Sequence, residues 1–215
     1  MALKAFVDLD RVLYNSDALK IRHLAVLGAL LDGKRYAPEI LALYNKSKRD
    51  SIYDVDRHIA LLSQASGYPA FDIRKKIESF MRRDAQQFMY PDAELFLQRL
   101  AELGYEIWIA TAGIDWFQEE KIPVDFYRCI AGVKVTQDTT KTSVIGRFAD
   151  PEKDDIVLFD DSVEVINPVK QIFPNVCAIQ VAREDVPYPA KDTIFADSRV
   201  RNLEEAFGAI IHRPR

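Results

Sequence analysis

Short apolar runs recur along the chain and are separated by stretches with helical periodicity. The runs lie at residues 5–7, 107–110, 156–159 and 176–179. Runs of this length that are apolar throughout are typical of parallel strands buried on both faces. Because they alternate with helical stretches, we predict an α/β fold with a doubly wound parallel sheet. In such a sheet the ligand site lies beyond the carboxyl ends of the strands.

A long helical segment interrupts this alternation after the first run. Residues 15–89 contain no strand-like run, and four helices are predicted near residues 17–31, 37–47, 51–65 and 71–88. We therefore expect a core of residues 1–14 and 90–215 with an inserted helical domain of residues 15–89. In the core, further helices are predicted near 92–103, 140–148, 163–173 and 203–211, and a short strand near 193–195.

The charge balance shows no basic footprint for nucleic acid or anionic membranes. The chain has 33 acidic and 29 basic residues and a net charge of -4, so a small-molecule partner is expected. No apolar run approaches the roughly 20 residues that span a bilayer. The two cysteines lack metal-type spacing and the N-terminus lacks a signal-peptide pattern, which favours a cytoplasmic setting. The oligomeric state stays open.

Two pairs of acidic residues follow two of the predicted strands. Asp8 and Asp10 come after the run at 5–7, and Asp160 and Asp161 come after the run at 156–159. Like charges gathered at one edge of a sheet disfavour one another unless cations offset them. Because these are oxygen ligands and no His or Cys is nearby in sequence, the expected ion is Mg²⁺.

A third strand end carries groups suited to bind an anion. Thr111 follows the run at 107–110, and Ala112 and Gly113 beside it are expected to offer unhindered backbone N–H groups to a phosphate. Thr111 could therefore bind the same ligand as the acidic pairs.

A lysine is expected beside these acids. Lys141 stands at the predicted start of the helix near residues 140–148, which would place it in the first helical turn and let it face the same crevice. Lys134 is the competing candidate, and the helix start favours Lys141.

The segments that hold these residues follow the order of a known set of motifs. VDLDRVLYNSD resembles motif I of the haloacid dehalogenase (HAD) superfamily, WIATAG resembles motif II, Lys141 suits motif III, and VLFDDS resembles motif IV. The resemblance covers about residues 1–14 and 90–215, and residues 15–89 lie where this family inserts its C1 cap. It implies a HAD-like Rossmannoid core with a helical cap.

The resemblance also implies a Mg²⁺-dependent phosphohydrolase that acts on a small phosphorylated metabolite. Asp8 would be the nucleophile that forms an aspartyl-phosphate, and Asp10 would be the general acid and base. Thr111 would bind a phosphoryl oxygen, and Lys141 would offset negative charge. The ion would be held by Asp8, the backbone carbonyl of Asp10, Asp161 and, directly or through water, Asp160.

Arg11 departs from the family pattern, which usually has glycine after the second Asp. This puts in doubt whether the loop keeps its usual conformation. One interpretation is that the guanidinium group grips the phosphoryl group or a second anionic group of the substrate. The other is that it points outward, forms a surface ion pair and has no role in turnover.

Other functions stay open beside the phosphohydrolase. A phosphomutase would use the same residues and return the phosphoryl group to a second hydroxyl. A dehalogenase also uses an Asp nucleophile but needs neither Asp10 nor the acidic pair. A non-catalytic binding protein could keep the fold, and its signature would be the loss of a catalytic residue.

Several polar and aromatic side chains have ordinary structural interpretations. His23 and His58 could contact substrate, but a solvated surface position is favoured for each, and Tyr44 and Phe71 are expected to pack inside the helical segment. Glu164 is expected to be an exposed glutamate in the first turn of its helix.

Overall fold

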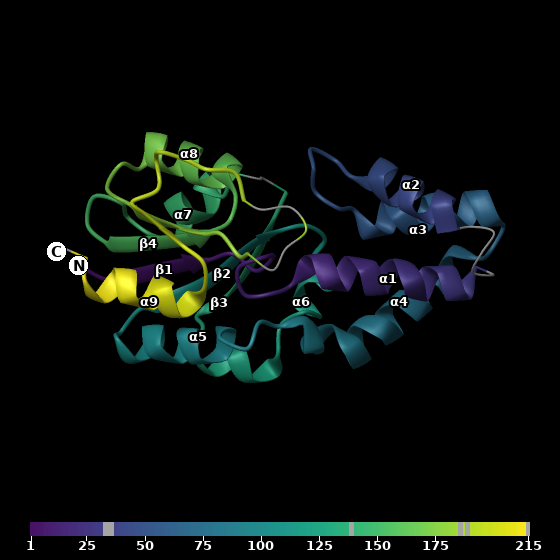
Figure 1. Ribbon diagram of the computed structural model, residues 1–215, viewed down its shortest axis with the longest axis horizontal. Helices are drawn as coiled ribbons and strands as arrows, with labels where there is room; N and C mark the ends of the chain where they lie inside the picture. The colour runs from purple at the N-terminus through teal and green to yellow at the C-terminus, as the bar shows by residue number, and fades with distance from the viewer. Residues whose placement is uncertain (32–36, 138–139, 185–186, 188–189, 214–215) are drawn as a thin grey trace.

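A six-stranded, all-parallel sheet forms the centre of the molecule (Figure 1). The computed structural model describes residues 1–31, 37–137, 140–184, 187 and 190–213. The strands lie in the order β3-β2-β1-β4-β5-β6. Their bounds are β1 Leu3–Val7, β2 Glu106–Ala112, β3 Gly132–Thr136, β4 Asp155–Asp160, β5 Cys177–Val181 and β6 Ser198–Val200. The predicted α/β fold with a doubly wound parallel sheet is confirmed.

Helices cover both faces of the sheet. On one face α5 (Ala93–Glu102) packs beside α9 (Leu203–Ile211), and on the other α7 (Thr142–Phe148) packs beside α8 (Val163–Ile172) (Figure 1). Successive residues of β1 alternate between the two cores, since Ala5 and Val7 join the cluster that includes α5 and α9, whereas Phe6 joins the one that includes α7 and α8. Burial on both faces explains why the strands are apolar throughout.

The two edge strands differ from the sequence prediction. β3 was not predicted, because none of its five residues is fully buried and no apolar run marks it. The strand predicted near residues 193–195 is wrong, since the last strand is β6 at Ser198–Val200 and the Ile194 side chain is 94% exposed. Edge strands pair on one side only, so their sequences carry a weaker signal.

The segment between the first two strands is helical, as predicted. It comprises α1 (Ser16–Leu30), α2 (Ala37–Ser47), α3 (Val55–Ser66), α4 (Ala70–Asp84) and the 3₁₀ helix η1 (Ala85–Phe88). α3 begins later than expected because the Asp54 side chain caps it, accepting a hydrogen bond from the Arg57 backbone N–H. Tyr44 is buried as expected, but the expectation for Phe71 is wrong because its side chain is 71% exposed.

This helical segment leaves and rejoins the rest of the chain at one place. The backbone N–H of Asn15 donates to the Phe88 carbonyl at 2.8 Å, and the Tyr90 N–H donates to the Leu13 carbonyl at 2.9 Å. The two connections therefore run side by side, and α1 to α4 gather at one end of the molecule (Figure 1). No helix in the described part of the chain is both long and apolar enough to cross a membrane.

Candidate active site

The buried end of the site is an ion triad at the carboxyl ends of the two central strands. Asp8 follows β1 and Asp160 ends β4, and the two strands are direct neighbours. Lys141 lies between them, with its Nζ atom 2.5 Å from Asp8 Oδ1 and 2.6 Å from Asp160 Oδ2. All three side chains are nearly inaccessible to solvent. Burial lowers the pKa of Lys141, but Asp160 and Asp8 raise it more, so the lysine stays charged.

Lys141 reaches this position through an unusual backbone conformation. It is the N-cap of α7 with a φ of 58°, so the expectation that it lies in the first helical turn is wrong by one residue. Lys134, the competing lysine, lies elsewhere: its Nζ atom sits 5.1 Å and 4.7 Å from the ring centres of Trp108 and Phe148. The structure thus brings Lys141, and not Lys134, to the acidic residues.

Three carboxylates are close enough to share a metal ion. Among the described residues, Asp8, Asp160 and Asp161 each offer an oxygen atom, and these atoms lie within 4.8 Å of one another. Burial raises the pKa of Asp161 to about 7, and the neighbouring Asp160 adds to the effect. Burial likewise raises the pKa of Asp8 well above its usual value, although Lys141 opposes the shift. A divalent cation would offset this repulsion, and oxygen-only donors suit Mg²⁺.

Within this cluster, the oxygens of Asp160 are already engaged. Its Oδ1 accepts a hydrogen bond from the Ser162 backbone N–H at 2.9 Å, and its Oδ2 faces Lys141. Asp8 Oδ1 also pairs with Lys141, and Asp161 Oδ2 faces Arg11 at 3.8 Å. Whether Asp160 would contact an ion directly or through water stays a prediction. Asp10 contributes no carboxylate to the cluster.

The Asp10 carboxylate points instead to two residues that the sequence did not single out. Lys121 Nζ lies 2.7 Å from Asp10 Oδ1, and Gln118 Nε2 donates to Asp10 Oδ2 at 3.3 Å. Gln118 also donates to the Ala112 carbonyl at 2.7 Å. Lys121 is buried and follows the short helix α6 (Asp115–Glu119), which comes directly after β2. The sequence offered one indication of this role, since Gln118 and Lys121 lie a few residues after Thr111.

The residues at the carboxyl end of β2 agree only in part with the predicted anion site. Thr111 is fully buried, and its Oγ1 atom has no hydrogen-bond partner among the described residues, so the hydroxyl group is available to a ligand. The backbone N–H of Gly113, in contrast, donates to the Thr136 carbonyl at 3.1 Å. The expectation of a free N–H at Gly113 is therefore wrong. The glycine is needed for space, because a Cβ atom there would lie 2.5 Å from Gln118 Nε2.

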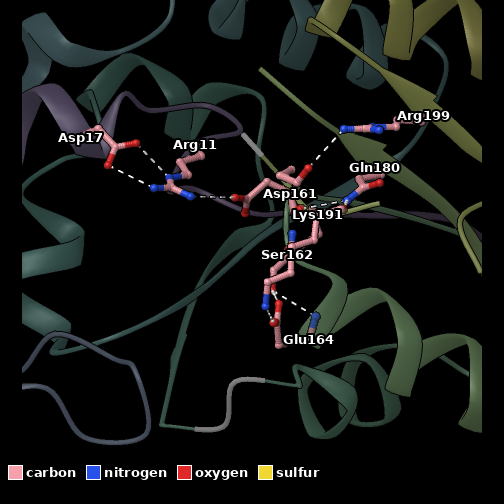
Figure 2. Close-up of polar contacts among 10 residues, drawn as sticks. Arg11, Asp17, Asp161, Ser162, Glu164, Gln180, Lys191 and Arg199 are labelled. Atoms are coloured by element: carbon pink, nitrogen blue, oxygen red, sulfur yellow. Dashed lines mark hydrogen bonds and ion pairs between the residues drawn. The ribbon is translucent and has the colours of Figure 1, made fainter. Parts of the chain in front are cut away.

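Arg11 lines the cavity and forms ion pairs instead of pointing outward, and its contact with a substrate stays a prediction. Its Nε and Nη2 atoms donate to the two carboxylate oxygens of Asp17 at 2.9 and 3.1 Å, and its Nη1 atom faces Asp161 at 3.8 Å (Figure 2). The guanidinium group is partly buried and bridges two acids rather than pointing outward. Its φ of 63° lies in the left-handed region that glycine favours, so arginine adopts a glycine-like conformation here.

Glu164 lies at the edge of the site, as expected. It is in the first turn of α8, where its carboxylate accepts from the Ser162 hydroxyl group and pairs with Lys191 at 3.0 Å (Figure 2). Its side chain is largely exposed. This position fits a surface ion pair and not a further metal ligand.

A cavity of about 420 Å³ joins these groups to the helical segment. Residues that follow β1, β2 and β4 line its buried part. The helical segment and α6 supply the rest of the lining, which includes Lys20, His23, Tyr44, Lys48, Tyr53 and Phe117.

Two histidines of the helical segment are buried, so the expectation of solvated surface residues is wrong. His23 and His58 have exposed fractions of 1% and 0%. The hydroxyl group of Tyr53 lies between them, 3.0 Å from His23 Nε2 and 2.8 Å from His58 Nδ1. Burial lowers the pKa of His23 to about 3, with His58 and Lys121 adding to the effect, and burial lowers the pKa of His58 to about 4.

The comparisons with known proteins rest on structure. No protein-family model matches the sequence, and no curated protein matches it significantly. A haloacid dehalogenase-like hydrolase from Burkholderia xenovorans LB400 is similar in structure, with a TM-score of 0.75, 15% identity, and 96% of this chain and 95% of that one covered. A HAD phosphatase from Thermococcus onnurineus gives a TM-score of 0.72, 17% identity and 97% coverage of both chains.

The similar structures span several reactions. A β-phosphoglucomutase-like protein from Thermotoga maritima gives a TM-score of 0.65 at 13% identity, with 99% of this chain and 100% of that one covered. Others are a Bacillus subtilis hydrolase described as bound to magnesium and a dehalogenase described with an intermediate complex. Identities this low show the fold and leave the reaction to be argued from the site. The chain therefore has the fold of the haloacid dehalogenase superfamily of hydrolases.

Proposed function

We propose that this protein is a Mg²⁺-dependent phosphohydrolase that acts on a small phosphorylated metabolite. The observation that carries the proposal is the buried Asp8, held by Lys141 and sharing one cavity with Asp10, Thr111 and Asp161. A carboxylate nucleophile, a second carboxylate near it and a free hydroxyl group are the parts that transfer of a phosphoryl group to aspartate requires.

Asp8 would attack the phosphorus atom, forming a bond from its carboxylate oxygen while the bond to the substrate oxygen breaks. Asp10 would give a proton to the leaving oxygen and then take one from the water that hydrolyses the aspartyl-phosphate. The Thr111 hydroxyl group would donate to a phosphoryl oxygen. Lys121 and Gln118 would hold the Asp10 carboxylate in place, because both contact it directly.

The charges of the site support a divalent ion beside these residues. Lys141 pairs with both Asp8 and Asp160, and Lys121 pairs with Asp10, whereas Asp161 faces an Arg11 that is already bound to Asp17. Asp8 and Asp161 would hold Mg²⁺, with Asp160 bound directly or through water and the Asp10 backbone carbonyl as a further ligand. When bound, the ion would supply positive charge to the phosphoryl oxygens.

Residues 15–89 would form a cap and residues 1–14 and 90–215 the catalytic core. The paired connections at Leu13–Asn15 and Phe88–Tyr90 support these boundaries. Lys20, Tyr44 and Tyr53 from the proposed cap line the cavity that holds Asp8, so they would contact the part of the substrate that is not transferred.

Of the other functions, a dehalogenase and a non-catalytic protein fit these residues less well, and a phosphomutase fits them equally well. A dehalogenase has no use for Asp10 or for the buried Asp160 and Asp161, and each residue expected for catalysis is present, which disfavours a non-catalytic protein. A phosphomutase would use the same groups.

A phosphate-release screen tests the proposal. Purified protein is incubated with sugar phosphates, nucleotides and phospho-acids, with Mg²⁺ and with excess EDTA. We expect phosphate release from at least one compound in Mg²⁺ and its loss in EDTA. Full activity in EDTA would contradict the metal requirement. Transfer of phosphate between hydroxyl groups of one sugar, without release, would identify a mutase.

A further inference from the structure

The part of the cavity lined by the helical segment carries two lysines that pair with no carboxylate among the described residues. Lys20 on α1 and Lys48 just after α2 both line the cavity. Their Nζ atoms lie 4.9 and 5.4 Å from the centre of one ring, that of Tyr44. Within the described part of the chain, neither ammonium group forms an ion pair.

The ring that these lysines share is held firmly. Tyr44 is buried and stacks on Tyr53 with ring centres 4.4 Å apart, and Tyr53 packs edge-on against Phe117 at 5.6 Å. Because Phe117 belongs to α6, the aromatic wall ties the lysines to the end of the cavity that holds Asp10. Contact with an aromatic face stabilises an ammonium group without neutralising its charge.

Positive charge is in surplus at this place. Burial lowers the pKa of Lys48, and Lys20 and Arg11 lower it further, while Asp17 raises it. Asp17 is already bound to the guanidinium group of Arg11 through both carboxylate oxygens. Among the described residues, no carboxylate pairs with either lysine, and the nearby Asp17 is shared with Arg11, whereas the buried end has more carboxylates than lysines.

We propose that Lys20 and Lys48 bind a second anionic group of the substrate while its phosphoryl group lies at Asp8. The substrate class would be small phosphomonoesters that carry a further carboxylate or phosphate. This inference rests on the proposed function, because it assumes that the phosphoryl group occupies the end of the cavity near Asp8.

Two matched pairs of probes test the inference. Glycerol 3-phosphate differs from 3-phosphoglycerate, and sorbitol 6-phosphate from 6-phosphogluconate, in having CH₂OH where the partner has a carboxylate. Affinities are measured by calorimetry in Mg²⁺ on the Asp8→Asn variant, which keeps both lysines and should not turn the probes over. In at least one pair we expect the carboxylate to bind about ten- to a hundredfold more tightly.

Lysine variants show whether that preference arises at the proposed site. Adding Lys20→Met and Lys48→Met together should abolish the preference and leave the affinity for the member that lacks the carboxylate within about twofold. The matched control is Lys46→Met, because Lys46 is an exposed lysine on α2 that does not line the cavity. That variant should keep the preference.

Two results would overturn the inference. One is equal affinity for both members of both pairs in the protein that keeps the lysines. The other is a double variant that weakens both members of a pair equally, since the lysines would then act only on the phosphoryl group. Failure of the proposed function is a separate result, because it appears as the absence of phosphate release by the unaltered protein.

Discussion

At the scale of single residues, two of the four described non-glycine residues with positive φ lie beside the acids of the site. Arg11 and Lys141 adopt φ values of 63° and 58°, in the left-handed region that costs a non-glycine residue about 1–2 kcal/mol. Both side chains are fixed by ion pairs with acids of the site. Strained conformations persist where the surrounding contacts determine them, and functional sites are where such residues gather.

Replacing Arg11 separates its possible roles. Arg11→Gly relieves the strain and removes a positive charge 3.8 Å from the Asp161 carboxylate. Because the guanidinium group already donates twice to Asp17, we expect the KM for substrate to change little. The Mg²⁺ concentration for half-maximal activity should fall about two- to tenfold, since Asp161 loses a competing cation. Activity measured against Mg²⁺ concentration checks this.

Arg11→Lys is the control for charge, and it should keep the Mg²⁺ requirement close to that of the unaltered protein. A rise in KM of about tenfold or more in Arg11→Gly, with an unchanged Mg²⁺ requirement, would instead show that Arg11 grips the phosphoryl group.

Lys121 offers a second test at this scale. Lys121→Met removes the ion pair with Asp10, so the carboxylate loses its fixed position and kcat should fall about ten- to a hundredfold, with KM nearly unchanged. Lys121→Arg should recover part of the loss. Lys134→Met is the matched control, because Lys134 packs on Trp108 and Phe148 outside the cavity. A rise in the KM of Lys121→Met, with kcat unchanged, would contradict a positioning role.

At the scale of elements, a chain of hydrogen bonds links three helices of the proposed cap. His58 Nε2 donates to the Ile40 carbonyl at 3.3 Å, so the neutral ring accepts from the Tyr53 hydroxyl group through Nδ1. Tyr53 in turn accepts from His23 Nε2–H. The chain requires a neutral His58, because its Nδ1 atom accepts, whereas protonation of His23 would place a charge at its buried Nδ1 atom, which has no hydrogen-bond partner among the described residues.

Acid should therefore weaken the fold through His23. Its pKa is about 3 in the folded protein and about 6.5 when unfolded, so the unfolded state binds the extra proton below pH 6.5. Stability from this group is complete above pH 6.5 and is lost as the pH falls toward the folded value. At pH 5 the loss is about 2 kcal/mol.

Urea unfolding at pH 7.5 and pH 5.0 measures the effect. The unaltered protein should lose about 2 kcal/mol more than His23→Gln between these pH values. The two proteins are compared because Asp8 and Asp161 affect both of them equally. Their raised pKa values mean that these carboxyl groups take up protons on folding, which stabilises the fold as the pH falls and opposes the effect of His23. His212→Gln, at an exposed position near the C-terminus, should behave like the unaltered protein. Equal losses in His23→Gln and the unaltered protein would refute the account.

How far the sequence predicted these elements depended on burial. β1, β2, β4 and β5 carry apolar runs because both of their faces are covered, and their ends placed Asp8, Thr111 and Asp160 correctly side by side. β3 and β6 lie at the edges and left no comparable pattern.

Other features of the site depend on contacts between distant residues. Lys121 meets Asp10 across 111 positions of sequence, and His23 meets Tyr53 across 30. Neither contact has a local pattern, so the burial of these polar side chains could not be predicted.

At the scale of the whole molecule, the sheet and the helical segment contribute different residues to the cavity. Asp8, Asp160 and Thr111 lie at the carboxyl ends of parallel strands. The strand order of the sheet reverses beside β1, which is where such folds bind their ligands. The helical segment, joined by two adjacent connections, contributes aromatic and basic residues to the lining of the same cavity. Under the proposed function, this division would let the groups at the strand ends react with a substrate that the helical segment selects.

The central claim is that Asp8 is the nucleophile of a Mg²⁺-dependent phosphohydrolase. The most direct measurement is phosphate release by the unaltered protein and by Asp8→Asn, at equal concentrations in Mg²⁺, on the best compound from the screen. The account predicts turnover by the unaltered protein and none by Asp8→Asn, with both folded by circular dichroism, because the amide removes the attacking oxygen and a metal ligand. Substantial phosphate release by Asp8→Asn would contradict the covalent mechanism.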